Sequence, residues 1–230
     1  EKAELLIVIP AYNEAENIER VVNHLTANFP QYDYVVVNDG SRDETAAICQ
    51  RNGYNLLNLP VNLGLAGAFQ AGLKYADKYG YQYAVQLDGD GQHRPEYLES
   101  MIKKMEEDYD IVIGSRFVGE KKPFTMRMLG SNLIEMAIRF TTGVNIKDPT
   151  SGMRMFSKRM IREFASGLNY GPEPDTVSYL IRQGARVAEV PVIMDERILG
   201  VSYLTPVNAM RYMLKMLISI LLIQNFRKRR

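Results

Sequence analysis

The residues with the clearest chemical potential are two carboxylates that follow the apolar run Tyr83 to Leu87. The run predicts a buried strand, and Asp88 and Asp90 come directly after it with one residue between them. Residues i and i+2 of a strand point to the same side, so both carboxylates can face one site. Paired oxygen ligands suit Mg²⁺ or Mn²⁺, with other positions left for water and phosphate. Asp and Gly are also ordinary turn residues, so a simple turn stays open at this point.

Polar clusters follow two other predicted strands. Tyr12-Asn13-Glu14 follows the apolar run Leu5 to Ile9, and Asp39-Gly40-Ser41 follows the run Tyr34 to Val37. Strand and helix patterns alternate through residues 5–117, which predicts βαβ units and a mostly parallel sheet. Ligands of such sheets bind outside the carboxyl ends of the strands. Three polar clusters at that edge favour an enzyme site over three unrelated turns.

The remaining elements are predicted from apolar periodicity and turn residues. Asn13 is the expected N-cap of the first helix, whose apolar residues recur at helical spacing. Pro95 is expected to open a helix, where proline is tolerated. We expect strands at 5–9, 34–37, 56–59, 83–87 and 111–114, and helices after Asn13, after Thr45, and at 62–78, 95–107, 126–140 and 206–226.

Composition and missing motifs exclude several classes of protein. The 230 residues are 46% hydrophobic and 24% charged, as in a globular protein, and the net charge of +1 gives no general attraction to nucleic acid. One cysteine, Cys49, excludes an intramolecular disulfide, and with two histidines it disfavours a zinc site. The first residues show no signal-peptide pattern. Without a dinucleotide fingerprint, a P-loop or a nucleophile elbow, the chain is not expected to be a dehydrogenase, a P-loop enzyme or an α/β-hydrolase.

Several segments together resemble family 2 inverting glycosyltransferases of the GT-A fold. They are Ile9–Glu14, Val37–Asp43, Asn62–Gly64, Leu87–His93 and Gly114–Arg116. A second group resembles the dolichyl-phosphate mannose synthase branch, which moves a sugar onto polyprenyl phosphate; it comprises Asp148–Arg154, Glu189–Val192, Arg197 and Gly200–Ser202. The resemblance covers residues 4–204. It implies an α/β GT-A domain at 1–204, with a mostly parallel central sheet flanked by helices, and leaves a C-terminal amphipathic helix with a basic end at 205–230.

The resemblance assigns the nucleotide to the ends of the first strands. Carboxylates can accept hydrogen bonds from a base or a ribose, and a tyrosine ring offers a stacking face. For Glu14 the alternative is an acid that complements the dipole of the first helix turn, and for Gly64 it is a simple loop–helix junction. The expected nucleotide-binding residues are Pro10, Tyr12, Glu14, Asp39, Gly64 and Asp88.

The resemblance also implies a divalent cation. Asp88, Asp90 and Gln92 match a D-x-D-x-Q pattern that holds Mg²⁺ or Mn²⁺ against the diphosphate, with Asp90 as the principal carboxylate. The cation would act as a Lewis acid on the leaving nucleoside diphosphate. His93 is expected to be a neighbour of the cation site rather than a ligand.

Arginines are expected to contact phosphate, because a guanidinium pairs bidentately with such groups. Arg116, Arg154 and Arg197 are the candidates, and for Arg197 a surface cation is the alternative. Ser151, Gly152 and Ser202 match the acceptor side of the family. This chain has Tyr203 where the family pattern usually has a lysine, which puts a second cation beside the phosphates in doubt.

The acceptor decides whether a general base is needed. A phosphate monoester is already a nucleophile at neutral pH, whereas a sugar hydroxyl must lose a proton. Glu173 lies between two prolines and Asp175 follows the second, and one of these acids could serve as that base. The alternative for Asp175 is an N-cap of the following helix.

The tail at 206–226 carries apolar residues at helical spacing and ends in Arg227-Lys228-Arg229-Arg230. Its wholly apolar part, Met216 to Ile223, is too short to cross a hydrocarbon core of about 30 Å. We expect an interfacial helix with cations on anionic headgroups, and the alternative is a core or homo-oligomer interface. The apolar face of the helix at 126–140 could flank the lipid entrance.

We therefore expect a metal-dependent inverting glycosyltransferase. It would move a sugar from a nucleoside diphosphate sugar, with UDP favoured over GDP on general frequency, to an undecaprenyl-type polyprenyl phosphate. It would be cytoplasmic and peripheral on the inner face of the membrane. The alternatives are transfer to a hydroxyl of a cell-surface polysaccharide or glycolipid, and a non-catalytic GT-A binding domain. The sequence does not fix the sugar.

Overall fold

A computed structural model of the chain describes residues 4–120, 122, 125–166, 171, 173–195 and 206–223, without the side chains of residues 126, 127, 206 and 207. Its elements in chain order are β1 (Leu5–Ala11), α1 (Ile18–Asn28), β2 (Asp33–Asn38), α2 (Thr45–Arg51), β3 (Leu56–Asn58), α3 (Gly64–Tyr79), β4 (Tyr83–Gln86), the 3₁₀ turn η1 (Pro95–Tyr97), α4 (Leu98–Met105), β5 (Ile111–Ser115), α5 (Met126–Thr142), β6 (Arg154–Ser157), α6 (Lys158–Ser166), α7 (Pro174–Arg182), β7 (Val187–Pro191) and α8 (Pro206–Leu221).

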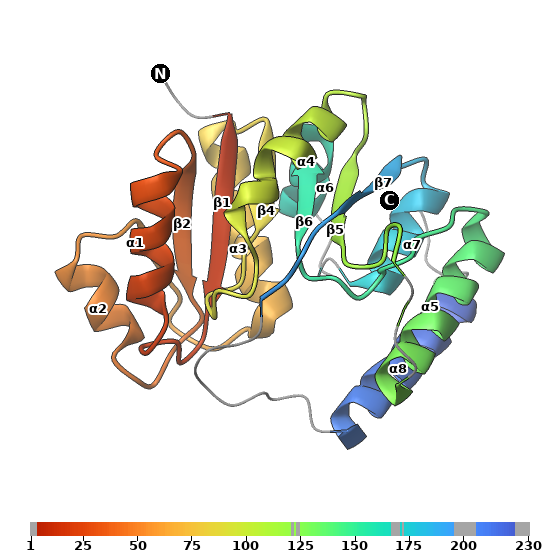
Figure 1. The fold of residues 1–230 in the computed structure, drawn as a ribbon. Helices are drawn as coiled ribbons and strands as arrows, with labels where there is room; N and C mark the ends of the chain where they lie inside the picture. The colour runs from red at the N-terminus through yellow and green to blue at the C-terminus, as the bar shows by residue number, and fades with distance from the viewer. Residues whose placement is uncertain are drawn as a thin grey trace.

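One sheet of seven strands forms the centre of the molecule, in the order β3-β2-β1-β4-β6-β5-β7 (Figure 1). β1, β2, β3 and β4 are mutually parallel, and β5 is parallel to β7. β6 is antiparallel to both of its neighbours, β4 and β5. The expected α/β class with a mostly parallel sheet is confirmed. The short strand β6, which the sequence did not predict, fills the sheet between its two parallel groups.

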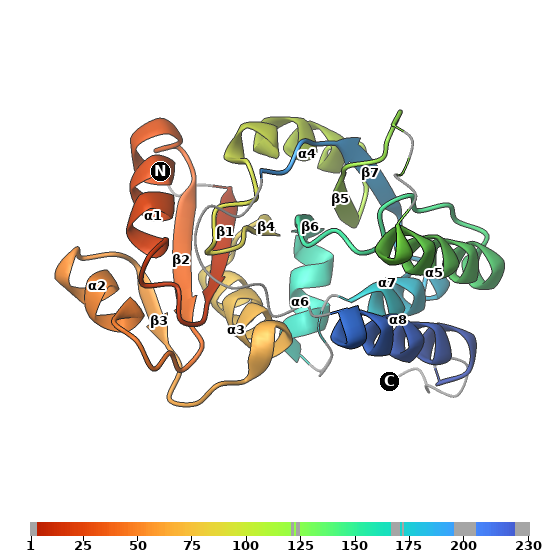
Figure 2. The same cartoon turned by 60° about the horizontal axis from the view of Figure 1, so that its bottom comes forward.

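The sheet is covered on both faces, which explains why its strands read as unbroken apolar runs. All seven residues of β1 are buried. They alternate between two cores: Leu6 and Val8 pack with α3, α6 and α7, whereas Leu5, Ile7 and Ile9 pack with α1, α2 and α4. This period of two places helices on either side of the sheet, as Figure 2 shows from below. The expected strands at 5–9, 34–37, 56–59, 83–87 and 111–114 are all found within two residues.

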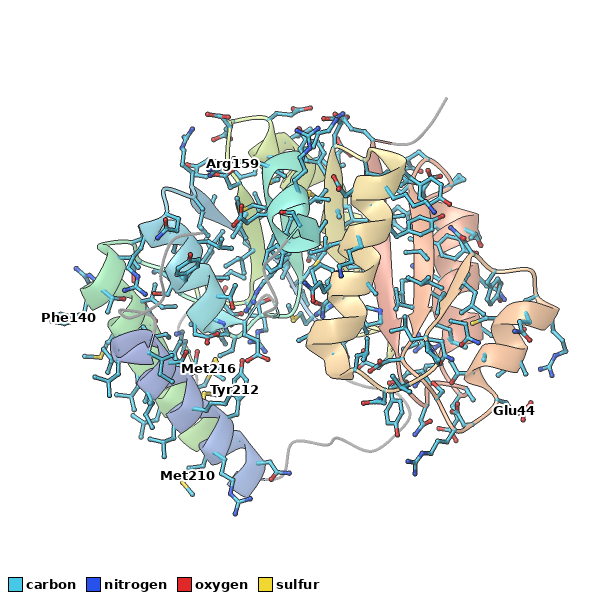
Figure 3. The ribbon with its side chains drawn as sticks, turned by 180° about the vertical axis from the view of Figure 1, so that it is seen from behind. Glu44, Phe140, Arg159, Met210, Tyr212 and Met216 are labelled. Carbon is cyan, nitrogen blue, oxygen red and sulfur yellow. The ribbon has the colours of Figure 1, made fainter. Side chains whose placement is uncertain are left out.

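Helices α5 and α8 lie side by side at one end of the molecule (Figures 1 and 3). Thr125 caps α5, accepting a hydrogen bond from the Met128 N–H at 3.2 Å. α8 buries Met216 and Ile220 against the domain. Among the described residues, no helix is long and apolar enough to cross a bilayer. The expected helices at 126–140 and 206–226 are found as α5 and α8, and the residues after 223 lie outside the described part.

Two predicted helix caps are wrong. Asn17, not Asn13, is the N-cap of α1. Asn13 has a φ of 55° and bridges two loops, because its N–H donates to Ser41 Oγ at 3.0 Å and its Oδ1 accepts from the Arg42 N–H at 2.9 Å. Glu14 consequently lies before α1 rather than in its first turn.

At the second site Glu173, not Asp175, is the N-cap of α7, and Pro174 takes the first helical position. Proline suits that position because its missing N–H would have had no helical partner. Asp175 therefore lies one residue inside the helix, in the first turn.

Candidate active site

The ends of three adjacent parallel strands bring the predicted polar clusters together. β2, β1 and β4 are neighbours in the sheet, so the residues after Asn38, Ala11 and Gln86 leave at one edge. The Asp39 N–H donates to the Ala11 carbonyl at 2.9 Å. A Cβ added at Gly89 would lie 3.1 Å from the Pro10 carbonyl oxygen. The turn with the two aspartates thus packs directly on the exit of β1.

Asp88 is oriented by a hydrogen bond at one oxygen and has His93 beside the other. The Gln86 amide donates to Asp88 Oδ1 at 2.9 Å, and His93 Nε2 lies 3.6 Å from Oδ2. The Asp88 N–H donates to His93 Nδ1 at 3.0 Å. With Nδ1 accepting, the proton of the neutral ring sits on Nε2, so neither nitrogen offers a lone pair to a metal. The geometry favours His93 as a neighbour of the site rather than a ligand.

Asp90 is mostly buried in a tight turn. The Gly91 N–H donates to the Asp88 carbonyl at 3.2 Å, and the Gln92 N–H donates to Asp90 Oδ1 at 3.0 Å. Arg20 donates from Nη2 to the Asp90 carbonyl at 3.1 Å. Gly91 has a φ of 81°, and a Cβ there would lie 2.7 Å from Arg20 Nη2. The positive φ explains the glycine at this position, whereas the Arg20 guanidinium could move aside for a side chain.

Asp39 ties the end of β2 to the start of α3. Its Oδ1 accepts from the Leu63 N–H at 2.7 Å, and its carbonyl accepts from the Asn62 amide at 3.0 Å. Gly40 has a φ of 64°, and a Cβ there would lie 2.7 Å from the Asn62 backbone nitrogen. Gly64 has a φ of 77° with nothing packed near its Cβ position, so its conformation rather than a close contact explains the glycine.

Glu14 lies beside the turn that carries the aspartates. Its Cγ is 3.5 Å from the Cβ position of Gly89, and its Oε2 accepts from Asn17 Nδ2 at 2.9 Å. Its N–H donates to Thr45 Oγ1 at 2.9 Å. Pro10 is buried in β1, and Tyr12 is half-buried just after it. The expected nucleotide-binding residues therefore gather at one edge with Asp88 and Asp90.

The donor set fits a cation that is completed by substrate. Among the described residues, no group of three or more His, Cys, Asp or Glu side chains could hold a metal ion. Asp88, Asp90 and Gln92 share one short turn and offer carboxylate and amide oxygens. Mg²⁺ and Mn²⁺ bind in this way, through one or two carboxylates plus water and phosphate oxygens. The residues present fit such an ion bound together with a diphosphate.

The predicted acceptor-side segment reaches the same turn through Gly152. A Cβ at Gly152 would lie 3.2 Å from His93 Cε1 and 3.5 Å from Asp88 Oδ2. Ser151 beside it is buried, and its hydroxyl donates to the Gly114 carbonyl at 2.5 Å. Gly152 therefore lies at the site, whereas the Ser151 hydroxyl holds this segment against β5.

Arg116 is engaged within the protein. Its Nε and Nη2 donate to the two oxygens of Asp148, each at 2.8 Å, and its N–H donates to Oδ2 at 3.0 Å. Asp148 is fully buried, and its own N–H donates to Glu189 Oε1 at 2.8 Å. The guanidinium of Arg116 thus pairs bidentately with the Asp148 carboxylate. Contact of Arg116 with phosphate stays a prediction.

Arg154 lies in a buried polar cluster between β6, α7 and α8. The residue is 5% exposed, and its Nη2 donates to the Pro149 carbonyl at 2.6 Å. Its Nε has no hydrogen-bond partner in the part of the chain that is described. Burial raises the pKa of Glu173 nearby, and the charge of Asp175 raises it further. Asp175 Oδ2 accepts from the Ser219 hydroxyl at 2.6 Å, which attaches α8 to α7.

Two predicted residues, Arg197 and Ser202, lie outside the described residues. Sequence reasoning missed the partners that hold the site in place: Gln86, Arg20, Asp148 and Asp195. Gln86 could have been found from its spacing of two residues before Asp88 on a strand. Each of the others makes its contact across at least 32 residues of chain, and no local pattern marks such a pair.

Comparisons with known proteins identify the family of this chain. The model of the family described as "Glycosyl transferase family 2" matches residues 6–165. Polyprenol monophosphomannose synthase of Mycolicibacterium smegmatis is 31% identical over 223 residues, which cover 91% of this chain and 84% of that protein. Undecaprenyl-phosphate mannosyltransferase of Micrococcus luteus is 31% identical over 210 residues, 86% of each chain.

Solved structures share the fold. Glucosyl-3-phosphoglycerate synthase of Mycobacterium tuberculosis, solved with Mn²⁺, UDP and glucosyl-3-phosphoglycerate, aligns with a TM-score of 0.72 and 18% identity. The alignment covers 98% of this chain and 81% of that one. Such neighbours are GT-A glycosyltransferases, so the expected GT-A fold is confirmed.

Proposed function

The chain belongs to glycosyl transferase family 2, and from this premise we propose that it is a cation-dependent, inverting enzyme that moves a sugar from a nucleoside diphosphate sugar to a polyprenyl phosphate. The observation that carries the proposal is the meeting of the Asp88–Asp90 turn with Glu14 on one side and Gly152 on the other. Both curated relatives act, by name, on polyprenol or undecaprenyl phosphate. Because both names include mannose, mannose is the first sugar to test.

In this proposal the donor lies across the ends of β1, β2 and β4. Glu14, Asp39 and Tyr12 contact the base and ribose through carboxylate and ring. Asp88, Asp90 and the Gln92 amide oxygen hold the cation, which when bound stabilises the charge that grows on the leaving diphosphate. A single in-line displacement at the sugar carbon inverts its configuration. Arg197, which lies outside the described residues, is proposed to contact the diphosphate.

The acceptor side fits a nucleophile that needs no base. The oxygens of Asp175 are engaged by the Ser219 hydroxyl and the Thr176 N–H, at 2.6 and 2.8 Å. A phosphate monoester carries its own negative charge and attacks without deprotonation. Glu173 supports the second candidate, a hydroxyl acceptor, because its raised pKa brings it nearer to that of a general base at neutral pH.

A lipid acceptor requires contact with the membrane surface, and we assign this to α5 and α8. Phe140 and Met136 on α5 are 86% and 66% exposed, and Met210 on α8 is 65% exposed. Phe140 and Met210 lie at the outer side of the helix pair in Figure 3. The exposed apolar residues of this face, named here the apolar face, recur at helical spacing: Leu129, Leu133, Met136 and Phe140 on α5, and Met210, Leu214, Ile218 and Leu221 on α8. Residues 205–230 would thus be the membrane-contacting extension of the domain.

The test is transfer from radiolabelled GDP-mannose, UDP-glucose and UDP-N-acetylglucosamine to undecaprenyl phosphate in vesicles with Mn²⁺. We expect one donor to give a lipid product whose formation stops in excess EDTA. Asp90→Ala should abolish turnover and leave the fold intact, since it removes the principal cation ligand. Asp77→Ala, on the surface of α3, is the matched control and should retain full activity. Substantial transfer by Asp90→Ala, or in EDTA, would refute the cation role.

A further inference from the structure

The segment that follows β7 runs along the turn that carries Asp88 and Asp90. Asp195 is its contact residue. The Asp195 N–H donates to the Gln92 carbonyl at 2.9 Å, and the Gln92 side-chain Nε2 donates to the Asp195 carbonyl at 3.3 Å. Gln92 is also bonded to Asp90 through its own N–H. Asp195, which follows β7 and lies 103 residues later in the chain, therefore holds both the backbone and the side chain of Gln92.

The direction of the Gln92 amide has a chemical consequence. An amide has one donor end and one acceptor end, and only the oxygen can coordinate a hard cation. Because the Asp195 carbonyl takes the nitrogen end, the oxygen end faces elsewhere. Within the described part of the chain, no hydrogen bond to that oxygen is present. The contact with Asp195 thus selects the orientation in which Gln92 can serve as a ligand.

An ion pair fixes Asp195 itself. Arg94 Nε donates to Asp195 Oδ1 at 2.8 Å, and Arg94 Nη2 contacts the same oxygen. The Arg94 guanidinium lowers the pKa of the Asp195 carboxyl. Every second residue from 90 to 94 thus belongs to one connected set of contacts. Asp90 accepts a hydrogen bond from the Gln92 N–H, and Gln92 bonds the Asp195 backbone. Arg94 pairs with the Asp195 side chain. The proposed chemistry makes no direct use of Arg94 or Asp195.

We propose that Arg94 and Asp195 are positioning residues for the cation, which hold Gln92 with its amide oxygen available to Mg²⁺ or Mn²⁺. The inference rests on the proposed function, because it assumes that the turn binds a cation with a nucleotide. Neighbours that orient a metal ligand without touching the metal commonly change metal affinity about 10- to 100-fold when they are removed.

The experiment measures Mn²⁺ binding directly, by electron paramagnetic resonance of free Mn²⁺, in the presence of UDP or GDP. The variants are Arg94→Ala, Asp195→Ala, Asp195→Asn and the double variant of the two alanines. The matched control is Arg186→Ala, because Arg186 pairs with Asp108 at 3.0 Å just before β7, at the opposite end of the same strand. Thermal unfolding verifies that each variant is folded, and Asp195→Asn serves if Asp195→Ala does not fold.

We expect Arg94→Ala and Asp195→Ala each to weaken Mn²⁺ about tenfold, and Asp195→Asn to fall between them and the wild type. The double variant should be no weaker than the worse single variant, because both changes break one connection. Transfer at saturating Mn²⁺ should stay within about threefold of wild type, which separates positioning from chemistry.

Unchanged Mn²⁺ affinity in the folded variants, or an equal loss in Arg186→Ala, would overturn this inference while the proposed function stood. A wild-type chain without Mn²⁺-dependent binding of either nucleotide would instead overturn the proposed function, and this inference with it.

Discussion

Replacing Arg116 by alanine separates two roles for this residue, a scaffold for the segment at 148 or a ligand for phosphate. Asp148 is fully buried and accepts three hydrogen bonds from Arg116, two of them from the guanidinium. Arg116→Ala removes those two, and of the partners within the described residues it leaves the buried carboxylate the backbone N–H alone. Breaking a buried ion pair from one side costs about 3–5 kcal/mol. The Arg116 side chain is 24% exposed, so water can reach the gap and we take the lower figure, about 3 kcal/mol.

For a domain of this size, 1 kcal/mol moves the melting temperature by about 2–4 °C, so Arg116→Ala should melt about 6–12 °C lower. Circular dichroism and urea unfolding measure the loss. Asp148→Asn in the same chain should recover part of it, because it removes the unpaired charge. Lys103→Ala is the control, since the Lys103–Glu99 pair is exposed and screened by solvent, so its loss should leave the melting temperature unchanged. A melting temperature within about 2 °C of wild type, with a selective rise in the donor KM, would refute the scaffold role.

Two further predictions concern Glu173 and the apolar face. Because the folded-state pKa of Glu173 is raised, its protonated form favours folding below the unfolded pKa of about 4.3, and that contribution is lost as pH rises through the folded pKa. As pH rises above about 4.3, the urea midpoint of Glu173→Gln should therefore increasingly exceed that of wild type, because glutamine stays neutral. The variant should keep transfer to lipid phosphate. Parallel midpoint-versus-pH curves, or a loss of lipid transfer, would contradict this prediction. The double variant Leu214→Glu with Ile218→Glu should lower binding to anionic vesicles at least about tenfold in flotation assays, because burying each apolar side chain in the membrane is worth about 1.5–3 kcal/mol. Binding equal to that of wild type would show that the apolar face does not contact the membrane.

The strands and the edge where they meet could be predicted, because buried parallel strands leave a strong local signal. Each apolar run ended near a polar cluster, and the sheet order makes the β1, β2 and β4 ends neighbours. The antiparallel strand β6, Arg154–Ser157, was not predicted, because only Met155 and Phe156 form an apolar run there, with a charged and a polar residue on either side. Its place between β4 and β5 depends on pairing partners that are distant in the sequence.

The helix caps failed for a related reason. Asn13 has the residue type of a cap, but its bonds to Ser41 and Arg42 cross 28 and 29 residues and hold it at a positive φ. Asp175 gave way to Glu173 because Pro174 fits the first position of the helix so well. Arg116 was expected to meet phosphate, and nothing local reveals that Asp148 folds back onto it. Residue type indicates which groups a side chain can bind, whereas the tertiary fold decides which of them it contacts in the folded protein.

In the proposed function, His93 lets the segment with Ser151 and Gly152 approach the Asp88–Asp90 turn without a lysine or arginine beside Asp88. Its ring lies against Gly152 and beside the Asp88 carboxylate, so it fills the space where the two segments meet. A lysine or arginine in that place would pair with Asp88 and compete with a cation for its charge. The His93 ring, whose Nδ1 accepts from the Asp88 N–H, offers packing and a weak donor instead. In the proposed function the carboxylate charge of the turn therefore stays available to the cation, and glycine at 152 leaves room for the ring.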